Sequence, residues 1–71
     1  MTQVSERFQR LLESCLVEVR VIRACDKTLG IRTPIPAKPK SETAAVQVLM
    51  DLKYLAWELE GRRNARLRAV A

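Results

Sequence analysis

Residues 31–40 read IRTPIPAKPK, and this stretch divides the chain into two parts. It contains all three prolines of the sequence, at positions 34, 36 and 39. Proline lacks a backbone N–H donor, fixes its own φ angle and pushes the preceding residue away from helical geometry. We therefore predict that residues 31–40 form an extended linker between two separate elements.

The linker also contains a short recognition pattern. Pro36 and Pro39 make a PxxP sequence with Lys38 and Lys40 beside it, and SH3-type domains bind segments of this composition. Such short patterns occur frequently by chance. The composition therefore favours the interpretation of a stiff linker.

The residues before the linker have the apolar spacing of a helix. Apolar residues recur at seven-residue intervals, and others fall three or four positions away from these. The members of this inner stripe are Val4, Phe8, Leu11, Leu12, Cys15, Val19, Ile22, Cys25 and Leu29. Gly30 follows the last of them, where a left-handed glycine commonly ends a helix. The pattern predicts a helix over about residues 4–29.

Residues 16–23, LVEVRVIR, permit a second interpretation. Valines at 17, 19 and 21 alternate with charged residues, as they would in a strand. We favour the helix because the seven-residue repeat passes through this segment without losing register, and no other segment supplies a partner strand. A strand here would instead give a dimeric β-ribbon followed by a helix, which is a DNA-binding arrangement.

The residues after the linker begin with the signals of a helix start. Ser41 is a good N-cap residue, and Glu42 places a negative charge in the first turn, where the helix dipole favours it. An inner stripe follows at helical spacing, made up of Ala45, Val48, Leu49, Leu52, Leu55, Ala56 and Leu59. Glu58 and Arg62 stand at i and i+4 across Gly61, which supports a continuous helix. We predict a helix over about residues 42–67.

Together these patterns predict an all-α fold, a two-helix hairpin in a single domain over residues 1–71. A chain of 71 residues can bury only a modest core and needs a further source of stability. Two cysteines and no histidine supply neither a disulfide framework nor a four-ligand zinc site. Association with another chain is the remaining source of stability. We predict a homodimer that forms a four-helix bundle.

Cys15 and Cys25 are expected to be buried, reduced and structural. They stand ten residues apart on one predicted helix. This spacing separates them by about 15 Å, too far for a disulfide. A nucleophilic role would need a nearby base, usually histidine, and the sequence has none.

The second predicted helix carries large side chains outside its inner stripe. Val46, Met50, Tyr54 and Trp57 follow one another at spacings of four, four and three residues. The first helix has a weaker counterpart in Val17, Val21 and Ala24. A two-helix hairpin needs one stripe per helix, so the second stripe predicts another partner. This partner is either a second copy of the chain or a larger protein, since Trp, Tyr, Met and Arg are enriched at protein interfaces.

Positive charge is concentrated near the end of the sequence. The formal net charge is +5, and residues 1–60 contribute only +1 of it. The remainder comes from arginines 62, 63, 66 and 68. We predict a partner-binding site at Met50, Tyr54, Trp57, Arg62, Arg63 and Arg66. Nucleic acid is the less favoured partner because no base-reading motif is present and a helix-turn-helix has a turn of only about three or four residues.

The residue types argue against catalysis. The chain has no histidine, no Gly-rich phosphate loop and no pair of carboxylates on an apolar face, so we predict no catalytic residue, metal or cofactor. Glu18 is the one acidic residue that interrupts the inner stripe. We expect it to set the pairing register or to meet Arg20 or Arg23.

The predicted location is the cytoplasm, because no apolar run approaches the ~20 residues of a membrane span and the N-terminus lacks a signal-peptide pattern. We predict a small non-enzymatic regulator or adaptor that occupies a surface of a larger protein. Anti-activators, inhibitors and chaperones of this size, such as phages and plasmids encode, act in this way. The alternative is a small basic dimer that binds nucleic acid.

Overall fold

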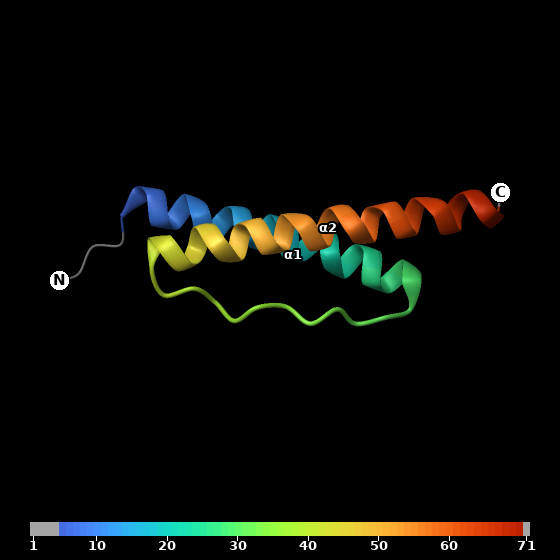
Figure 1. Ribbon diagram of the computed structural model, residues 1–71, viewed down its shortest axis with the longest axis horizontal. Coiled ribbons are helices and arrows are strands. Elements are labelled where there is room, and N and C mark those ends of the chain that lie inside the picture. Colours follow the sequence, from blue (N-terminus) through green and yellow to red (C-terminus); the bar gives the residue numbers. More distant parts are fainter. Residues whose placement is uncertain (1–4, 71) are drawn as a thin grey trace.

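The protein consists of two long helices joined by a linker, in a computed structural model that describes residues 5–70 (Figure 1). α1 is Glu6–Leu29 and α2 is Glu42–Val70. Between residues 5 and 70 there is no strand, so the predicted all-helical fold with two packed helices is confirmed. Residues 16–23 are helical, and the β-ribbon alternative is excluded. Val4, where the first helix was predicted to start, lies outside the described residues.

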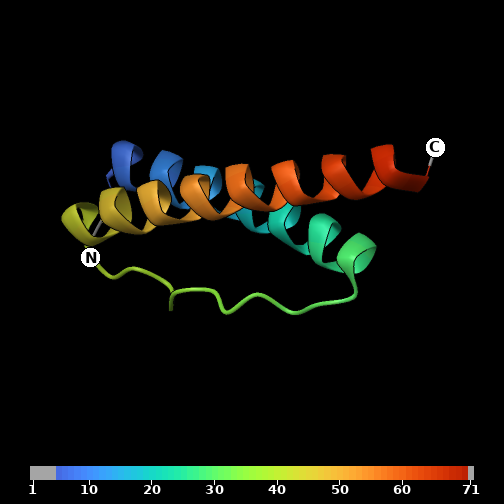
Figure 2. The ribbon, with the colours of Figure 1, turned by 45° about the vertical axis from the view of Figure 1, so that its right-hand side comes forward.

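The two helices run in the same direction. The linker leaves the end of α1, returns along both helices and reaches the start of α2 beside the start of α1 (Figures 1 and 2). At the start of the pair Ser5 hydrogen-bonds Glu42, and at the other end Arg66 hydrogen-bonds the carbonyl of Leu29. The sequence pattern predicted a helical hairpin but did not determine its direction. A short loop would have produced antiparallel helices.

The length of the linker matches the length of the helix beside it. α1 has 24 residues, which corresponds to about 36 Å of helix. Ten residues in a polyproline-like extended path cover about 31 Å, whereas ten helical residues would cover about 15 Å. The prolines that keep residues 31–40 extended are therefore what allows α2 to begin beside the start of α1.

Both ends of α1 are capped. The Ser5 hydroxyl accepts a hydrogen bond from the Phe8 amide, with 3.0 Å between N and Oγ, and donates one to the Glu42 carboxylate. Gly30 has φ 69° and ψ 33°, in the left-handed region, and its N–H donates to the Asp26 carbonyl. The predicted glycine cap is thus confirmed, whereas the Ser5 cap was not predicted.

α2 begins and continues as its sequence indicates. The Ser41 hydroxyl accepts a hydrogen bond from the Ala44 amide at 3.1 Å, which confirms the predicted N-cap. The helix passes through Gly61 without a break and ends at Val70, slightly beyond the predicted end at about residue 67.

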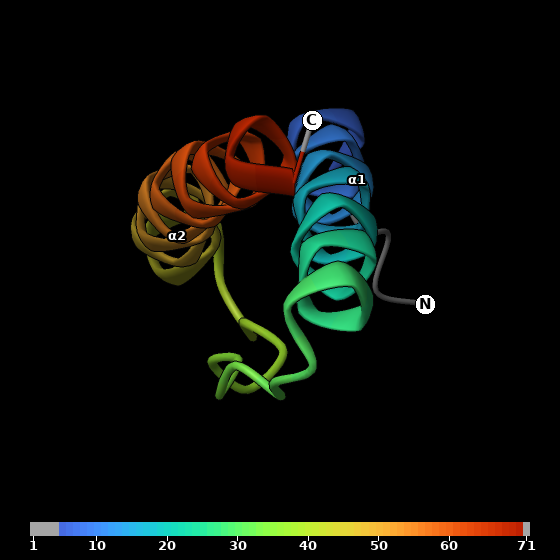
Figure 3. The ribbon, with the colours of Figure 1, turned by 90° about the vertical axis from the view of Figure 1, so that its right-hand side faces the viewer.

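The core lies between the inner faces of the two helices. Its largest almost fully buried side chains are Ile22, Cys25 and Leu52. The remaining buried apolar members are Cys15, Ala45, Ala56 and Leu59, all of which belong to the predicted inner stripes. Ile35 from the linker packs against this cluster. Viewed along the helices, the linker lies on one side of the pair, so it forms a third component of the core (Figure 3).

Candidate protein-binding surface

The side of α2 that faces away from α1 presents large apolar side chains to solvent. Met50 and Tyr54 are each 62% exposed, and Trp57 is 72% exposed. Val46, one turn before Met50, is also exposed. We call these four residues the outer stripe. Their helical spacing was predicted from the sequence. Packing within the chain leaves Met50, Tyr54 and Trp57 largely uncovered, and Val46 36% exposed.

The aromatic part of the outer stripe is a small cluster of its own. The ring centroids of Tyr54 and Trp57 lie 6.2 Å apart, with 43° between the ring planes. Tilted pairs at this separation are favourable, and burying one large side chain against a partner contributes about 1.5–3 kcal/mol. A protein surface that covered both rings would therefore gain substantial binding energy.

On α1, fewer of the residues predicted to form a second apolar stripe are exposed. Val17 and Ala24 are exposed, as expected. Val21, which was grouped with them, instead packs against the core and is only half-exposed. The reason is its position four residues before Cys25, because residues at this spacing share one face of a helix and Cys25 is fully buried.

The arginines near the end of α2 do not form one free face. Arg62 is exposed, but Arg63 is half-buried, and its Nε atom is buried without a hydrogen-bond partner in the described chain. The Arg66 guanidinium donates to the Leu29 carbonyl at 3.2 Å. Helix ends leave carbonyl groups unsatisfied, so Arg66 caps α1 from the neighbouring helix. Of the three predicted arginines, Arg62 is the most available to a partner.

The parallel arrangement gathers positive charge at one end of the molecule. The end of α1 lies beside the second half of α2, as the contact between Arg66 and Leu29 shows (Figure 1). We call the cationic residues of this region the basic end. They are Lys27, Arg32, Arg62, Arg63, Arg66 and Arg68. Lys27 and Arg32 were not predicted as site residues, because only the helix direction brings them near the arginines.

A buried aspartate fixes the start of the linker. The Asp26 carboxylate accepts hydrogen bonds from the Thr33 amide at 2.9 Å and from the Thr33 hydroxyl at 2.6 Å. The Arg23 guanidinium lies 2.8 Å from the same carboxylate and 3.0 Å from the Thr33 carbonyl. We call these three residues the Asp26 clasp. It holds the first residues of the linker against α1.

The clasp stabilises the ionised form of Asp26. Burial by itself raises the pKa of this carboxyl, since the side chain is only 5% exposed. The hydrogen bonds from Thr33 and Arg23, together with the positive charge of Arg23, outweigh burial and lower the pKa below its ordinary value. Sequence reasoning missed this residue. The available signal was an acidic residue in the last turn of a helix, where the dipole disfavours it without a partner.

Glu18 does not meet either of the arginines predicted for it, and its role in setting the pairing register stays a prediction. Within residues 5–70 it forms no ion pair shorter than 4 Å, and Arg23 pairs with Asp26 instead. Asp26 follows Arg23 by three positions on α1, so its carboxylate lies closer to the guanidinium than that of Glu18 does. Glu18 is half-exposed beside Lys53 in a shallow hollow between the helices.

Both cysteines are free and buried, as predicted. Burial, with a smaller contribution from the negative charge of Glu18, raises the pKa of the Cys15 thiol above its ordinary value. A thiol with a raised pKa stays protonated at neutral pH and is a poor nucleophile. Cys15 therefore acts as a small core residue.

Two further properties concern residues 5–70. No group of three or more His, Cys, Asp or Glu side chains in this range could hold a metal ion. None of its helices is long and apolar enough to cross a membrane. Comparison of the chain with known family models, with curated proteins and with solved structures gives no match in any of the three.

Proposed function

We propose that the protein is a small non-enzymatic regulator or adaptor that acts in the cytoplasm by occupying a surface of a larger protein. The observation that carries the proposal is the 72% exposure of Trp57, the one tryptophan of the chain, beside the exposed Tyr54 and Met50. Tryptophan and tyrosine are the residues most enriched among interface hot spots. The chain's own fold does not use these rings, which leaves them available to a partner.

We further propose a homodimer in which two copies form a four-helix bundle. Val17 and Lys53 line one shallow hollow between the helices, and Lys53 is one turn beyond Met50 on α2. Exposed apolar residues of both helices therefore border the same side of the pair. In this arrangement Val17 and Val46 lie in the dimer contact, and the aromatic pair stays free for the larger protein.

The basic end contributes to the same interaction through charge. It borders the aromatic pair, because Arg62 lies about 8 Å along α2 from Trp57. Positive charge beside an apolar anchor favours an acidic rim on the partner and raises the association rate. The proposed partner therefore has an apolar depression that accepts Trp57, with acidic residues around it.

Nucleic acid is the second candidate partner, and one observation favours it. Six cationic side chains from α1, the linker and α2 gather at the basic end. Such a cluster can bind phosphate groups, and release of counterions would make that binding fall steeply with salt. An interaction anchored by Trp57 would change little with salt.

The test starts from recovery of the partner from a host lysate by the full chain, with and without nuclease. Trp57→Ala should weaken binding of the recovered partner by about 2 kcal/mol or more, measured by calorimetry. Leu67→Ala is the matched control, because Leu67 is also an exposed apolar residue of α2 but lies outside the outer stripe. We expect it to leave the affinity unchanged.

Sedimentation velocity and circular dichroism of the same variants show whether the outer stripe contacts a second copy of the chain or the larger protein. Trp57→Ala should remain helical and dimeric. If it dissociates the dimer, the aromatic pair belongs to the dimer core, and the proposed docking role is wrong. If nuclease abolishes recovery of the partner, the nucleic-acid candidate replaces the protein partner.

A further inference from the structure

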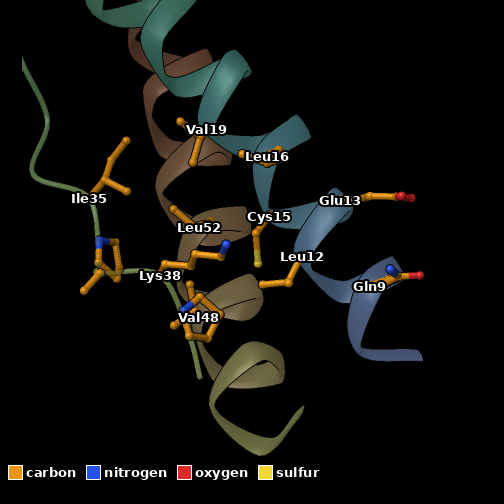
Figure 4. A pocket seen from close by; sticks show the side chains of 13 residues that line it. Gln9, Leu12, Glu13, Cys15, Leu16, Val19, Ile35, Lys38, Val48 and Leu52 are labelled. Carbon is orange, nitrogen blue, oxygen red and sulfur yellow. The ribbon is translucent and has the colours of Figure 1, made fainter. Parts of the chain in front are cut away.

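An apolar cavity of about 480 Å³ lies between the linker and the two helices (Figure 4). Cys15 of α1 and Leu52 of α2 line it from opposite helices, and residues 35–39 of the linker form its third side. This volume is within the range of small-molecule sites. The cavity lies on the linker side of the molecule and includes no residue of the outer stripe.

The linker is fixed on both sides of this cavity. It is held at one end by the Asp26 clasp and at the other by Pro39, which is buried. Between these points Pro34 and Pro36 restrict the backbone to extended conformations. The linker therefore spans the cavity as a stiff bridge, and the space below it is available to a ligand.

The lining determines which kind of ligand fits. Lining residues of α1 extend from Gln9 to Val19, about 15 Å along the helix. The cavity is thus elongated and suits a linear chain. Most lining side chains are aliphatic, and Lys38 is the one cation among them.

Lys38 supplies the polar contact. Its ammonium group projects from the linker across the cavity, whereas Gln9 and Glu13 point outward (Figure 4). Within the described chain no carboxylate lies within ion-pair distance of Lys38. Lys38 is exposed, so its ammonium group stands at the mouth of the cavity, where it can bind an anionic group of a ligand whose chain lies inside.

We propose that this cavity binds a free medium-chain alkyl carboxylate, with its chain against Cys15, Leu16 and Leu52 and its carboxylate on the Lys38 ammonium. Binding is non-covalent and involves no outer-stripe residue. It is therefore independent of the proposed protein interaction, and either proposal can fail without the other.

The first test is a chain-length series of hexanoate, octanoate and decanoate, titrated into the full chain by calorimetry below their micellar concentrations. Each added methylene that becomes buried should tighten binding about fourfold, from its transfer free energy. Equal affinity along the series would overturn the proposal, because a chain in the cavity must show this increment.

The second test concerns the carboxylate. Lys38→Gln should weaken decanoate binding about threefold, the scale of an exposed ion pair. It should leave decanol binding unchanged, since decanol has no charge. Lys40→Gln is the control, because Lys40 lies two residues away and does not line the cavity. If Lys38→Gln and Lys40→Gln bind decanoate equally well, the assignment of Lys38 is wrong.

The third test fills the cavity. Leu16 and Val17 are both exposed by more than half, but only Leu16 lines the cavity. Leu16→Trp should abolish decanoate binding, and Val17→Trp should retain it, with circular dichroism to establish that both remain helical. Retention of binding in both variants would place the ligand elsewhere. If Leu16→Trp does not fold, the comparison of Lys38→Gln with Lys40→Gln still tests the proposal.

A membrane lipid also combines an alkyl chain with an anionic group, and phosphatidylglycerol vesicles test whether such a lipid is the ligand. The basic end can bind these anionic vesicles by charge alone. We expect Leu16→Trp and Lys38→Gln to leave co-sedimentation unchanged, because acyl chains packed in a bilayer are not free to pass under the linker. Co-sedimentation that Leu16→Trp or Lys38→Gln abolishes would overturn the assignment to a free carboxylate and assign the cavity to a lipid.

Discussion

Residues on the side of the molecule where the helices and linker meet are buried or hydrogen-bonded, whereas the large apolar residues on the outer side of α2 are exposed. On the meeting side Leu52 is buried, the Asp26 carboxylate has hydrogen-bond partners and Gly30 adopts a conformation that favours glycine. On the outer side Met50 and Trp57 are exposed. Stability is therefore concentrated on the meeting side, and the outer side can change with little cost to the fold.

The difference does not come from residue type. The exposed surface of α2 also contains a large apolar residue, an aspartate, a glycine and an arginine, namely Met50, Asp51, Gly61 and Arg68. Position relative to the neighbouring helix and the linker decides whether such a residue stabilises the fold. Four matched pairs of substitutions can therefore break or sharpen the comparison, beginning with the pair that has the largest expected effect.

Leu52→Ala and Met50→Ala compare the two sides at two nearby positions of α2. Leu52 is 1% exposed, so its truncation should lower the free energy of unfolding by about 2–5 kcal/mol. Met50→Ala should change it by less than about 0.5 kcal/mol, as at most exposed sites. Urea denaturation followed by circular dichroism measures both. Similar losses would show that a partner or second copy buries Met50.

Asp26→Asn and Asp51→Asn compare two aspartates. An amide at position 26 would turn an NH₂ group toward the donors of Thr33 or Arg23, so the melting temperature at pH 7 should fall by about 5–10 °C. Asp51 is exposed and accepts one hydrogen bond from Gln47 at 3.1 Å. Its variant should melt close to the wild type.

The pH dependence of melting provides a second measurement on this pair. The pKa of Asp26 is lowered in the folded chain. The clasp therefore contributes its full stability above the unfolded pKa of about 3.9, and this contribution is lost as pH falls through the folded pKa. Asp26→Asn should flatten the melting curve against pH in this acidic range. A wild-type-like acid response in the variant would contradict the role of the clasp.

Gly30→Ala and Gly61→Ala should have effects of opposite sign. Gly30 has a φ of 69°, and a Cβ atom there meets nothing within 4 Å. The cost of about 1–2 kcal/mol is therefore one of backbone conformation alone. Gly61 is helical and has equally open surroundings. Alanine should stabilise it by about 0.5–1 kcal/mol. Destabilisation by Gly61→Ala would indicate a close partner at this point of α2.

Arg66→Ala and Arg68→Ala have the smallest expected difference. Arg66 caps the Leu29 carbonyl from an exposed position, so its loss should cost about 0.5 kcal/mol. Arg68 is exposed and forms no ion pair within 4 Å in the described chain. Its variant should match the wild type in urea denaturation. Equal stability of both variants would show that the cap contributes nothing in solution.

The sequence alone determined the helices, two of their caps and most of their buried faces. These features depend on local spacing, because apolar residues at helical intervals define a face and Ser41 and Gly30 act on backbone groups within four residues. The exposure of the outer stripe was predictable for the same reason. The placement of Val21 and the pairing of Glu18 with an arginine were predicted wrongly, because each depended on the width and edge of the contact with α2.

The tertiary structure alone decided the direction of the helices, the place of the linker in the core, the Asp26 clasp, the Arg66 cap and the cavity. An apolar stripe has the same spacing whichever way its helix runs, so periodicity contains no information on direction. The direction followed from the reach of an extended, proline-containing linker, which is long enough to return along α1. Once the helices were parallel, residues as distant in sequence as Leu29 and Arg66 came into contact, and positive charge gathered at one end.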